Sequence, residues 1–166
     1  MNTNMSICEE CGIEHPIEGL ELSFRRADVV AELSAEELTT RAQENNDLCV
    51  LDGDRFFVRT VLPLPVIKRE TPYNIGLWVE VSQCAFERIY ELWEEPGQAD
   101  EPAFPAHIAN DIPFHPSTIG LAATVSLTGP TTRPKVTLLA AEHPLVREQG
   151  SGITVHRASQ YSSSFA

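Results

Sequence analysis

Two short runs of β-branched and aromatic residues on either side of an Asp-Gly turn constrain the fold of this chain more than any other feature. The runs cover residues 48–51 and 56–61, and the turn lies at residues 52–54. This pattern predicts a β-hairpin, because Asp and Gly accept the positive φ angles that tight hairpin turns require. We expect Pro63 and Pro65 to end the second strand, since proline has no N–H to donate to a neighbouring strand.

Other apolar patterns predict further strands and two principal helices. The strands are expected over residues 20–24, 74–82, 118–127, 135–141 and 153–155. One helix is expected to begin after Ser34 and to run to about Gln43, because Ser34 and Glu37 have the spacing of a capping box. The other is expected from Gln83 to about Glu94, where apolar residues recur at helical spacing.

The whole pattern fits one α+β domain with a mainly antiparallel sheet. A chain of 166 residues can bury about 70% of its extended surface, so it needs no disulfides to fold. We place the domain at residues 1–157, with a zinc-knuckle-like segment at 6–16 and a flexible, Ser-rich tail at 158–166. Residues 95–117 carry five prolines and are expected to form an irregular loop, whereas His143-Pro144 is expected to open a short helix.

The charge balance is strongly acidic. Lys and Arg number 12 against 24 Asp and Glu, which gives a formal net charge of -12. Such a balance argues against nucleic acid and anionic membranes as partners, because both attract clustered Lys and Arg. It favours a basic protein partner, and one version of such a chain is an immunity or antitoxin protein that blocks a basic toxin. The first seven residues carry no Lys or Arg and no long apolar stretch follows, so we expect a cytoplasmic protein.

The sharpest motif is Cys8-x-x-Cys11-Gly-x-x-His15. Two cysteines separated by two residues and followed by glycine have the half-site spacing of zinc knuckles. A structural zinc site needs four ligands, and this segment supplies at most three. We therefore predict Cys49 as the fourth ligand, with His143 as the alternative. Two other interpretations stay open: Cys8 and Cys11 are free thiols without a metal, or they form a redox pair.

Four further residues are candidates for binding or chemistry. Arg59, in an aromatic strand, can bind an anion or pair with a neighbouring carboxylate. His143 can bind a metal or accept a proton, or it can cap the predicted helix through the backbone. His107 and His115 lie in the proline-rich loop, and an alternative function is a small-molecule binder or a metal-dependent enzyme that uses these histidines. The nucleotide-binding, metalloprotease and hydrolase signatures are missing, so we name no catalytic residue and favour a non-enzymatic protein.

Several motifs occur in an order that is specific when taken together. They are Cys8-x-x-Cys11-Gly-x-x-His15, Asp47-Leu48-Cys49, Phe56-Phe57-x-Arg59, Gly76-x-Trp78-Val79-x-Val81-Ser82, Pro116-x-Thr118 and His143-Pro144-Leu145-x-x-Glu148-Gln149-x-x-Gly152-Ile153. This order resembles the bacterial family known as domain of unknown function 2199, over about residues 8–157.

The resemblance implies a small bacterial protein and carries no established activity. It also implies that Cys8, Cys11, His15 and Cys49 belong to one pattern. The chain departs from its relatives at two places: residues 106–108 read Ala-His-Ile where they have Gly-Trp-Leu, and Ile75 stands where they have Trp.

Overall fold

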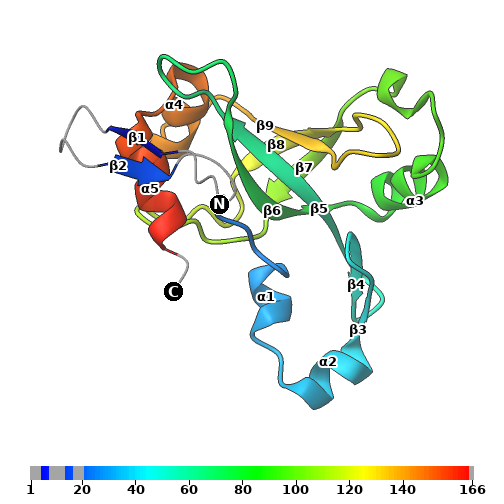
Figure 1. Ribbon diagram of the computed structural model, residues 1–166. Helices are drawn as coiled ribbons and strands as arrows, with labels where there is room; N and C mark the ends of the chain where they lie inside the picture. Colours follow the sequence, from blue (N-terminus) through cyan, green and yellow to red (C-terminus); the bar gives the residue numbers. More distant parts are fainter. Residues whose placement is uncertain (1–4, 8–13, 17–20, 165–166) are drawn as a thin grey trace.

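Five consecutive strands close into a small barrel in this computed structural model, which describes residues 5–7, 14–16 and 21–164 (Figure 1). The strands are β5 (Arg55–Leu64), β6 (Tyr73–Val81), β7 (Phe104–Ile108), β8 (Ala122–Ser126) and β9 (Lys135–Leu138). Neighbours along the chain are antiparallel, so the first and fifth strands run in the same direction. The barrel therefore closes through a parallel pairing, of Val61 with Lys135. A single α+β domain with a mainly antiparallel sheet is confirmed, and the closure of that sheet is new.

The predicted hairpin is confirmed at the start of the barrel. Strand β4 (Leu48–Leu51) pairs with β5, and the turn residues Asp52 and Gly53 both have positive φ angles. Strand β3 (Ala42–Glu44) pairs with β4, so the long β5 belongs both to the barrel and to a three-stranded extension.

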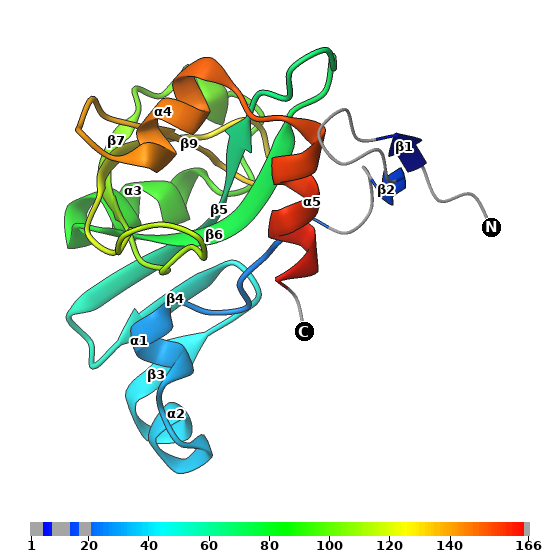
Figure 2. The same ribbon diagram turned by 90° about the vertical axis from the view of Figure 1, so that its left-hand side faces the viewer.

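Two short helices lie beside this extension (Figure 2). They are α1 (Asp28–Ala31) and α2 (Ala35–Arg41). The predicted capping box is present at the start of α2, where the Glu37 N–H donates to the Ser34 hydroxyl and the Ser34 N–H donates to the Glu37 carboxylate. The helix ends at Arg41, two residues before the expected end.

Pro63 lies within β5 and does not end it. The Arg59 N–H donates to the Asp47 carbonyl and the Val61 N–H donates to the Pro134 carbonyl, so these alternate N–H groups of β5 point away from β6. The nitrogen of Pro63 has the next position in this series, and its missing N–H leaves the hydrogen bonds between β5 and β6 intact. The strand therefore continues to Leu64, and the prediction that Pro63 ends it is wrong.

Strands β5 and β6 bury both of their faces. In β6, Leu77 and Val79 belong to the barrel core and are fully buried, as the alternating pattern predicts. Trp78 lies between them and is also buried, but it belongs to a second cluster with Phe57 and Cys49 on the opposite face. Burying a side chain the size of Leu or Phe stabilises a fold by roughly 1.5–3 kcal/mol, so both clusters hold the domain together.

The helices predicted after Ser82 and His143 are confirmed. Helix α3 (Gln83–Leu92) begins after Ser82, whose hydroxyl accepts a hydrogen bond from the Ala85 N–H. Helix α4 (Pro144–Ser151) begins after His143 and ends at Gly152, which has a φ of 90°. Within the described ranges, no helix is both long enough and apolar enough to cross a membrane.

Two segments in the middle and the start of the chain differ from the predictions. Of the predicted strand 20–24, the described residues 21–24 form only a single bridge, between Ser23 and Gly76. Strand β7 and the 3-10 helix η1 (Gln98–Asp100) lie inside the predicted irregular loop. Strand β7 tolerates Pro105 because its pairing with β6 is limited to His107 and Ile108, so Pro105 has a single neighbouring strand.

The C-terminal segment also differs. Within the predicted strand 153–155, Ile153 forms only a single bridge, with Val66. Helix α5 (Val155–Ser163) begins at the last residue of that predicted strand and takes up most of the predicted flexible tail. The Thr154 hydroxyl caps it by accepting a hydrogen bond from the Arg157 N–H, and Ala158 and Tyr161 are buried on one side. The strands β1 (Met5–Ile7) and β2 (Glu14–Pro16) pair with each other, and β2 contacts α5.

Candidate functional site

Two of the predicted metal ligands, His15 and Cys49, lie in elements that the structure describes. Cys8 and Cys11 lie outside the described residues, and His15 lies in β2. Figures 1 and 2 both place β2 beside α5. In both views β4, which carries Cys49, lies on the far side of the barrel strands, so His15 and Cys49 are not brought together. Among the residues that the structure describes, no three His, Cys, Asp or Glu side chains gather around a common point.

Cys49 is a thiol of the second core cluster. It is 2% exposed and clusters with Phe57 and Trp78. Burial raises the pKa of this thiol to about 11, and Glu44 contributes in the same direction while Arg26 opposes it. As arranged here, the Cys49 thiol is protonated at neutral pH and acts as a small apolar side chain.

His143 caps α4, which was one of the roles considered for it. Its Nδ1 accepts a hydrogen bond of 3.1 Å from the Leu145 N–H and is therefore unprotonated. Its Nε2 lies 3.2 Å from the carbonyl oxygens of both Pro116 and Ser117, to which it donates. The Nδ1 thus caps α4 and the Nε2 connects the start of α4 to the loop before β8, an arrangement that favours the capping role over metal binding.

His115 belongs to a buried polar network with α4 and α5. Its Nε2 lies 2.5 Å from the Tyr161 hydroxyl and 3.0 Å from Glu148 Oε1. Glu148 also accepts hydrogen bonds from the Tyr161 hydroxyl and, at 2.8 Å, from Arg157 Nε. The His115 and His143 rings are 5.7 Å apart, so the structure brings these two candidate histidines together. The His115 Nδ1 is buried and has no partner in the described part of the chain.

Glu148 is the anionic centre of this network. Burial alone would raise its pKa, but hydrogen bonds from His115, Tyr161 and Arg157 outweigh that effect and lower the pKa to about 2. Burial and the neighbouring Glu148 raise the pKa of Tyr161 well above its ordinary value. The network therefore contains a fixed carboxylate–guanidinium pair and a neutral phenol, which suits it to holding α4, α5 and the loop together.

His107 lies apart from the other two histidines. It is exposed on β7, opposite Glu80 of β6 and Ala122 of β8. A groove of about 650 Å³ lies between the end of β5, β9 and α4, and His107, His115 and His143 are all absent from its lining.

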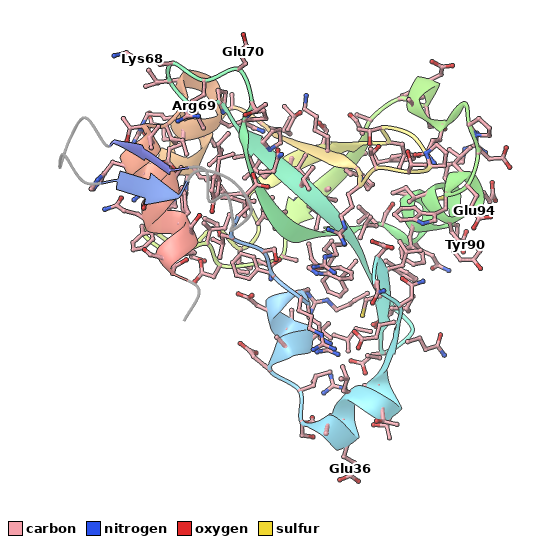
Figure 3. The ribbon with its side chains drawn as sticks, in the orientation of Figure 1. Glu36, Lys68, Arg69, Glu70, Tyr90 and Glu94 are labelled. Carbon is pink, nitrogen blue, oxygen red and sulfur yellow. The ribbon has the colours of Figure 1, made fainter. Side chains whose placement is uncertain are left out.

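The outward side of α3 carries an exposed aromatic residue among carboxylates. Tyr90 is 66% exposed, and Figure 3 shows it pointing outward beside Glu94. Glu87 and Glu91, three residues before and one residue after Tyr90, are also exposed. Glu87 and Tyr90 are three residues apart and share a face of α3, and Glu94 lies beside Tyr90 in the turn that follows the helix (Figure 3).

This surface keeps most of its negative charge. Residues 83–101 contain six carboxylates and a single basic residue, Arg88. Arg88 pairs with Glu91 and Glu101, so within the described residues Glu87 and Glu94 have no basic partner. The sequence analysis predicted an acidic surface but did not assign it to a particular element.

A small cavity surrounded by arginines lies where the segment before α1, the turn between β3 and β4, and β5 meet. Its volume is about 190 Å³, and it is lined by Arg25, Arg26, Glu44, Asn45, Asn46 and Arg59. Arg26 Nε and Nη2 donate to the Glu44 carboxylate at 2.8–3.1 Å. Arg59 makes no ion pair with the described carboxylates, so the paired arrangement considered for it is not found there.

Sequence reasoning identified Arg59 but missed the residues that surround it. Arg25 and Asn45 come from separate segments, and no motif connects them with β5 before the chain is folded. The same is true of Arg157 and Tyr161, whereas Glu148 was named only as part of the His143–Ile153 motif and was given no role. Contacts of this kind depend on tertiary packing and leave no periodic pattern in the sequence.

Comparison with known proteins agrees with the order of motifs. No curated protein and no solved structure matches the chain. A bacterial family described as "Uncharacterized protein conserved in bacteria (DUF2199)" matches residues 7–153, which is most of the chain. This protein therefore belongs to the DUF2199 family.

Proposed function

We propose that this chain is a non-catalytic binding protein that docks a basic protein on the outward face of α3. The observation that carries the proposal is the exposure of Tyr90, at 66%, on a face where Glu87 and Glu94 have no basic partner among the described residues. Exposed tyrosines at the centre of a surface are frequent anchors of protein interfaces. The surrounding carboxylates select the charge of the partner.

The face is also preformed, which lowers the entropy cost of binding. The other side of α3 is fixed by Ile89, which is fully buried in the barrel core, and by the Ser82 cap. Arg88 ties the helix to Glu101 through two hydrogen bonds of 3.0 and 3.1 Å. A partner therefore meets a helix whose backbone is already in place.

A basic toxin is the version of this partner that the size and net charge of the chain favour. An acidic inhibitor attracts a basic enzyme over a long range and raises the rate of association. In that version the chain acts as an immunity or antitoxin protein. A gene for a basic toxin beside the gene for this chain would support it.

Site-directed photo-crosslinking in the native bacterium tests the docking face. A photoreactive phenylalanine analogue replaces Tyr90 in one strain and Phe114, another exposed aromatic residue, in a control strain. We expect one basic protein to be captured at position 90 and absent at position 114. The same set of proteins at both positions, or none at position 90, contradicts the proposal.

The captured protein then allows a quantitative test. Against the purified partner, Tyr90→Ala and Glu94→Lys should each weaken binding by about tenfold or more, as expected for an anchor residue and a charge reversal at its side. The matched charge reversal Glu36→Lys, on the exposed surface of α2, should have little effect (Figure 3).

We also propose that Cys8, Cys11 and His15 hold a structural zinc ion. Cys49, the fourth ligand that the sequence predicts, would have to leave the second core cluster to complete the site. The support for this proposal is the knuckle spacing of the two cysteines and the histidine. Untagged protein purified without chelators should contain about one zinc per chain by mass spectrometry. Cys8→Ser should lose it, whereas Cys84→Ser, a change of an exposed thiol on α3, should keep it. A wild-type protein that contains no zinc would contradict the zinc site. The zinc content of Cys49→Ala shows whether Cys49 is the fourth ligand.

A further inference from the structure

Four arginines of this protein bind a carboxylate in the same way. In each of four pairs, the guanidinium edge formed by Nε and Nη2 faces both oxygens of one carboxylate, at 2.8–3.1 Å. The pairs are Arg26–Glu44, Arg41–Asp52, Arg55–Glu80 and Arg88–Glu101. This edge forms two parallel charge-assisted hydrogen bonds, which is the strongest arrangement available to arginine.

Arg59 departs from this pattern although it is partly buried. Its Nη1 donates to the Asn46 carbonyl at 3.3 Å, while its Nε is buried and has no acceptor among the residues described. A buried donor on a charged group is unfavourable unless an acceptor is supplied. The edge that binds carboxylates in the four pairs therefore has no described carboxylate partner at Arg59.

The electrostatic surroundings of Arg59 are equally unusual for so acidic a chain. Burial lowers its pKa, and the nearby guanidinium groups of Arg133 and Arg25 lower it further, while Asp47 acts in the opposite direction. Asp47 itself lies 3.5 Å from the Nε of Arg133, so its charge is shared with that residue. An anion in the cavity would relieve the repulsion among these arginines.

The other groups that line the cavity are mainly donors. The Asn45 Oδ1 accepts hydrogen bonds of 2.8 Å from the N–H groups of Asp47 and Leu48, which leaves its amide NH₂ as a donor. Glu44 is the one carboxylate in the lining, and its charge is paired with that of Arg26. Arg25 is exposed at the rim and forms no ion pair with a described residue.

We infer that this cavity binds an oxyanion, as the carboxylate or phosphate group of a small ligand. The guanidinium group of Arg59 binds the anion at the wall of the cavity, and the exposed Arg25 binds it from the solvent side. The volume of about 190 Å³ accommodates such a group, and the remainder of a larger ligand extends past Arg25. The site is separate from the α3 face and does not depend on the function proposed for that face.

Titration with simple anions followed by NMR tests this site on the full-length protein. The ¹⁵N–¹H signals of the arginine Nε–H groups are recorded with increasing inorganic phosphate and, separately, with acetate, at an ionic strength held constant with chloride. We expect a saturable shift of the Arg59 Nε–H signal with at least one of the two anions. A saturable shift with phosphate alone indicates phosphorylated ligands, and one with acetate alone indicates carboxylates. Saturable shifts with both anions indicate a general oxyanion site.

Three variants decide whether the shift reports this cavity. Arg59→Gln should abolish saturable binding, and Arg25→Gln should weaken it by about fivefold or more, as expected for the loss of a charged hydrogen bond. The control Arg147→Gln removes the same charge from an exposed position on α4 and should leave the affinity unchanged. Because Arg25 is exposed, its variant remains informative even where Arg59→Gln impairs folding. Absence of saturation with both anions in the wild type, or equal affinities in the wild type and Arg25→Gln, overturns the inference.

Discussion

Gly76 of β6 and Ser23 approach each other so closely that a Cβ atom on residue 76 would lie 2.8 Å from the Cβ of Ser23. Backbone hydrogen bonds hold this contact, because the Phe24 N–H donates to the Gly76 carbonyl at 2.8 Å and the Gly76 N–H donates to the Leu22 carbonyl at 2.9 Å. The glycine thus lets the segment before α1 lie directly on the barrel. Arg25 and Arg26 come next in the chain, so the same contact positions two of the residues that line the cavity beside Arg59.

Gly76→Ala should therefore destabilise the protein. The added methyl group meets the Cβ of Ser23, which can move only with its backbone, so we expect a loss of about 1–3 kcal/mol in the free energy of unfolding. Urea denaturation measures it. The control is Gly150→Ala in α4, where nothing lies within 4 Å of the added Cβ, and which should stabilise the helix by up to about 1 kcal/mol. Equal effects of the two changes would contradict the close approach.

Acid should destabilise the protein through Glu148. Its pKa is about 2 in the folded state against an ordinary 4.5, so it contributes stability that is complete above about pH 4.5 and is lost as the pH falls toward 2. A shift of this size corresponds to roughly 3 kcal/mol. Urea unfolding between pH 2 and 7 should show this decline in the wild type and a flatter profile in Glu148→Gln. Glu36→Gln, on exposed α2, should keep the wild-type profile, and a flat wild-type profile would refute the network.

His143 should stabilise the start of α4 through its cap. His143→Ala removes the acceptor of the Leu145 N–H and the donor to the loop carbonyls, so we expect a loss of about 1–2 kcal/mol. His143→Asn should recover part of it, because the asparagine oxygen can accept the same N–H. Hydrogen exchange at the Leu145 amide reports the cap directly. Unchanged protection of that amide in His143→Ala would rule out the capping role.

Cys84 and Cys49 should differ sharply in reactivity. Cys84 is exposed and should be alkylated in the native protein, whereas Cys49 is buried and should react only after unfolding, as peptide mapping by mass spectrometry can resolve. Burial also raises the pKa of Cys49 from 9.0 to about 11. Because the unfolded thiol ionises first, the contribution of Cys49 to stability should fall as the pH rises through this interval. Rapid native labelling of Cys49 would contradict its position in the core.

Local chemistry accounts for the elements that sequence analysis predicted correctly. The Asp52-Gly53 turn, the Ser34–Glu37 capping box and the Ser82 cap each depend on a few adjacent residues and appear unchanged in the structure. Pro144 at the first position of α4 is a signal of the same kind. Such signals depend little on tertiary packing, so they survive folding.

The missed elements depend on neighbours that lie elsewhere in the chain. Strand β7 forms despite Pro105 because β8 supplies its hydrogen-bond partners there. Helix α5 forms in a serine-rich segment because Tyr161 has a buried position to fill, beside the ring of Tyr73 at 6.0 Å. The lack of a carboxylate partner at Arg59 could not be predicted either, since both outcomes considered for that residue require knowledge of which carboxylates surround it.

The parallel pairing of Val61 with Lys135 also determines when the barrel can be completed. Hairpin pairs can form as the chain emerges from the ribosome, but the pairing that seals the barrel needs β9, far along the sequence from β5. Until β9 is in place, the row of apolar side chains that includes Leu62 and Leu64 has no cover on that side. Until β9 has been synthesised, a nascent chain therefore leaves these apolar side chains uncovered, which makes the incomplete chain prone to aggregation.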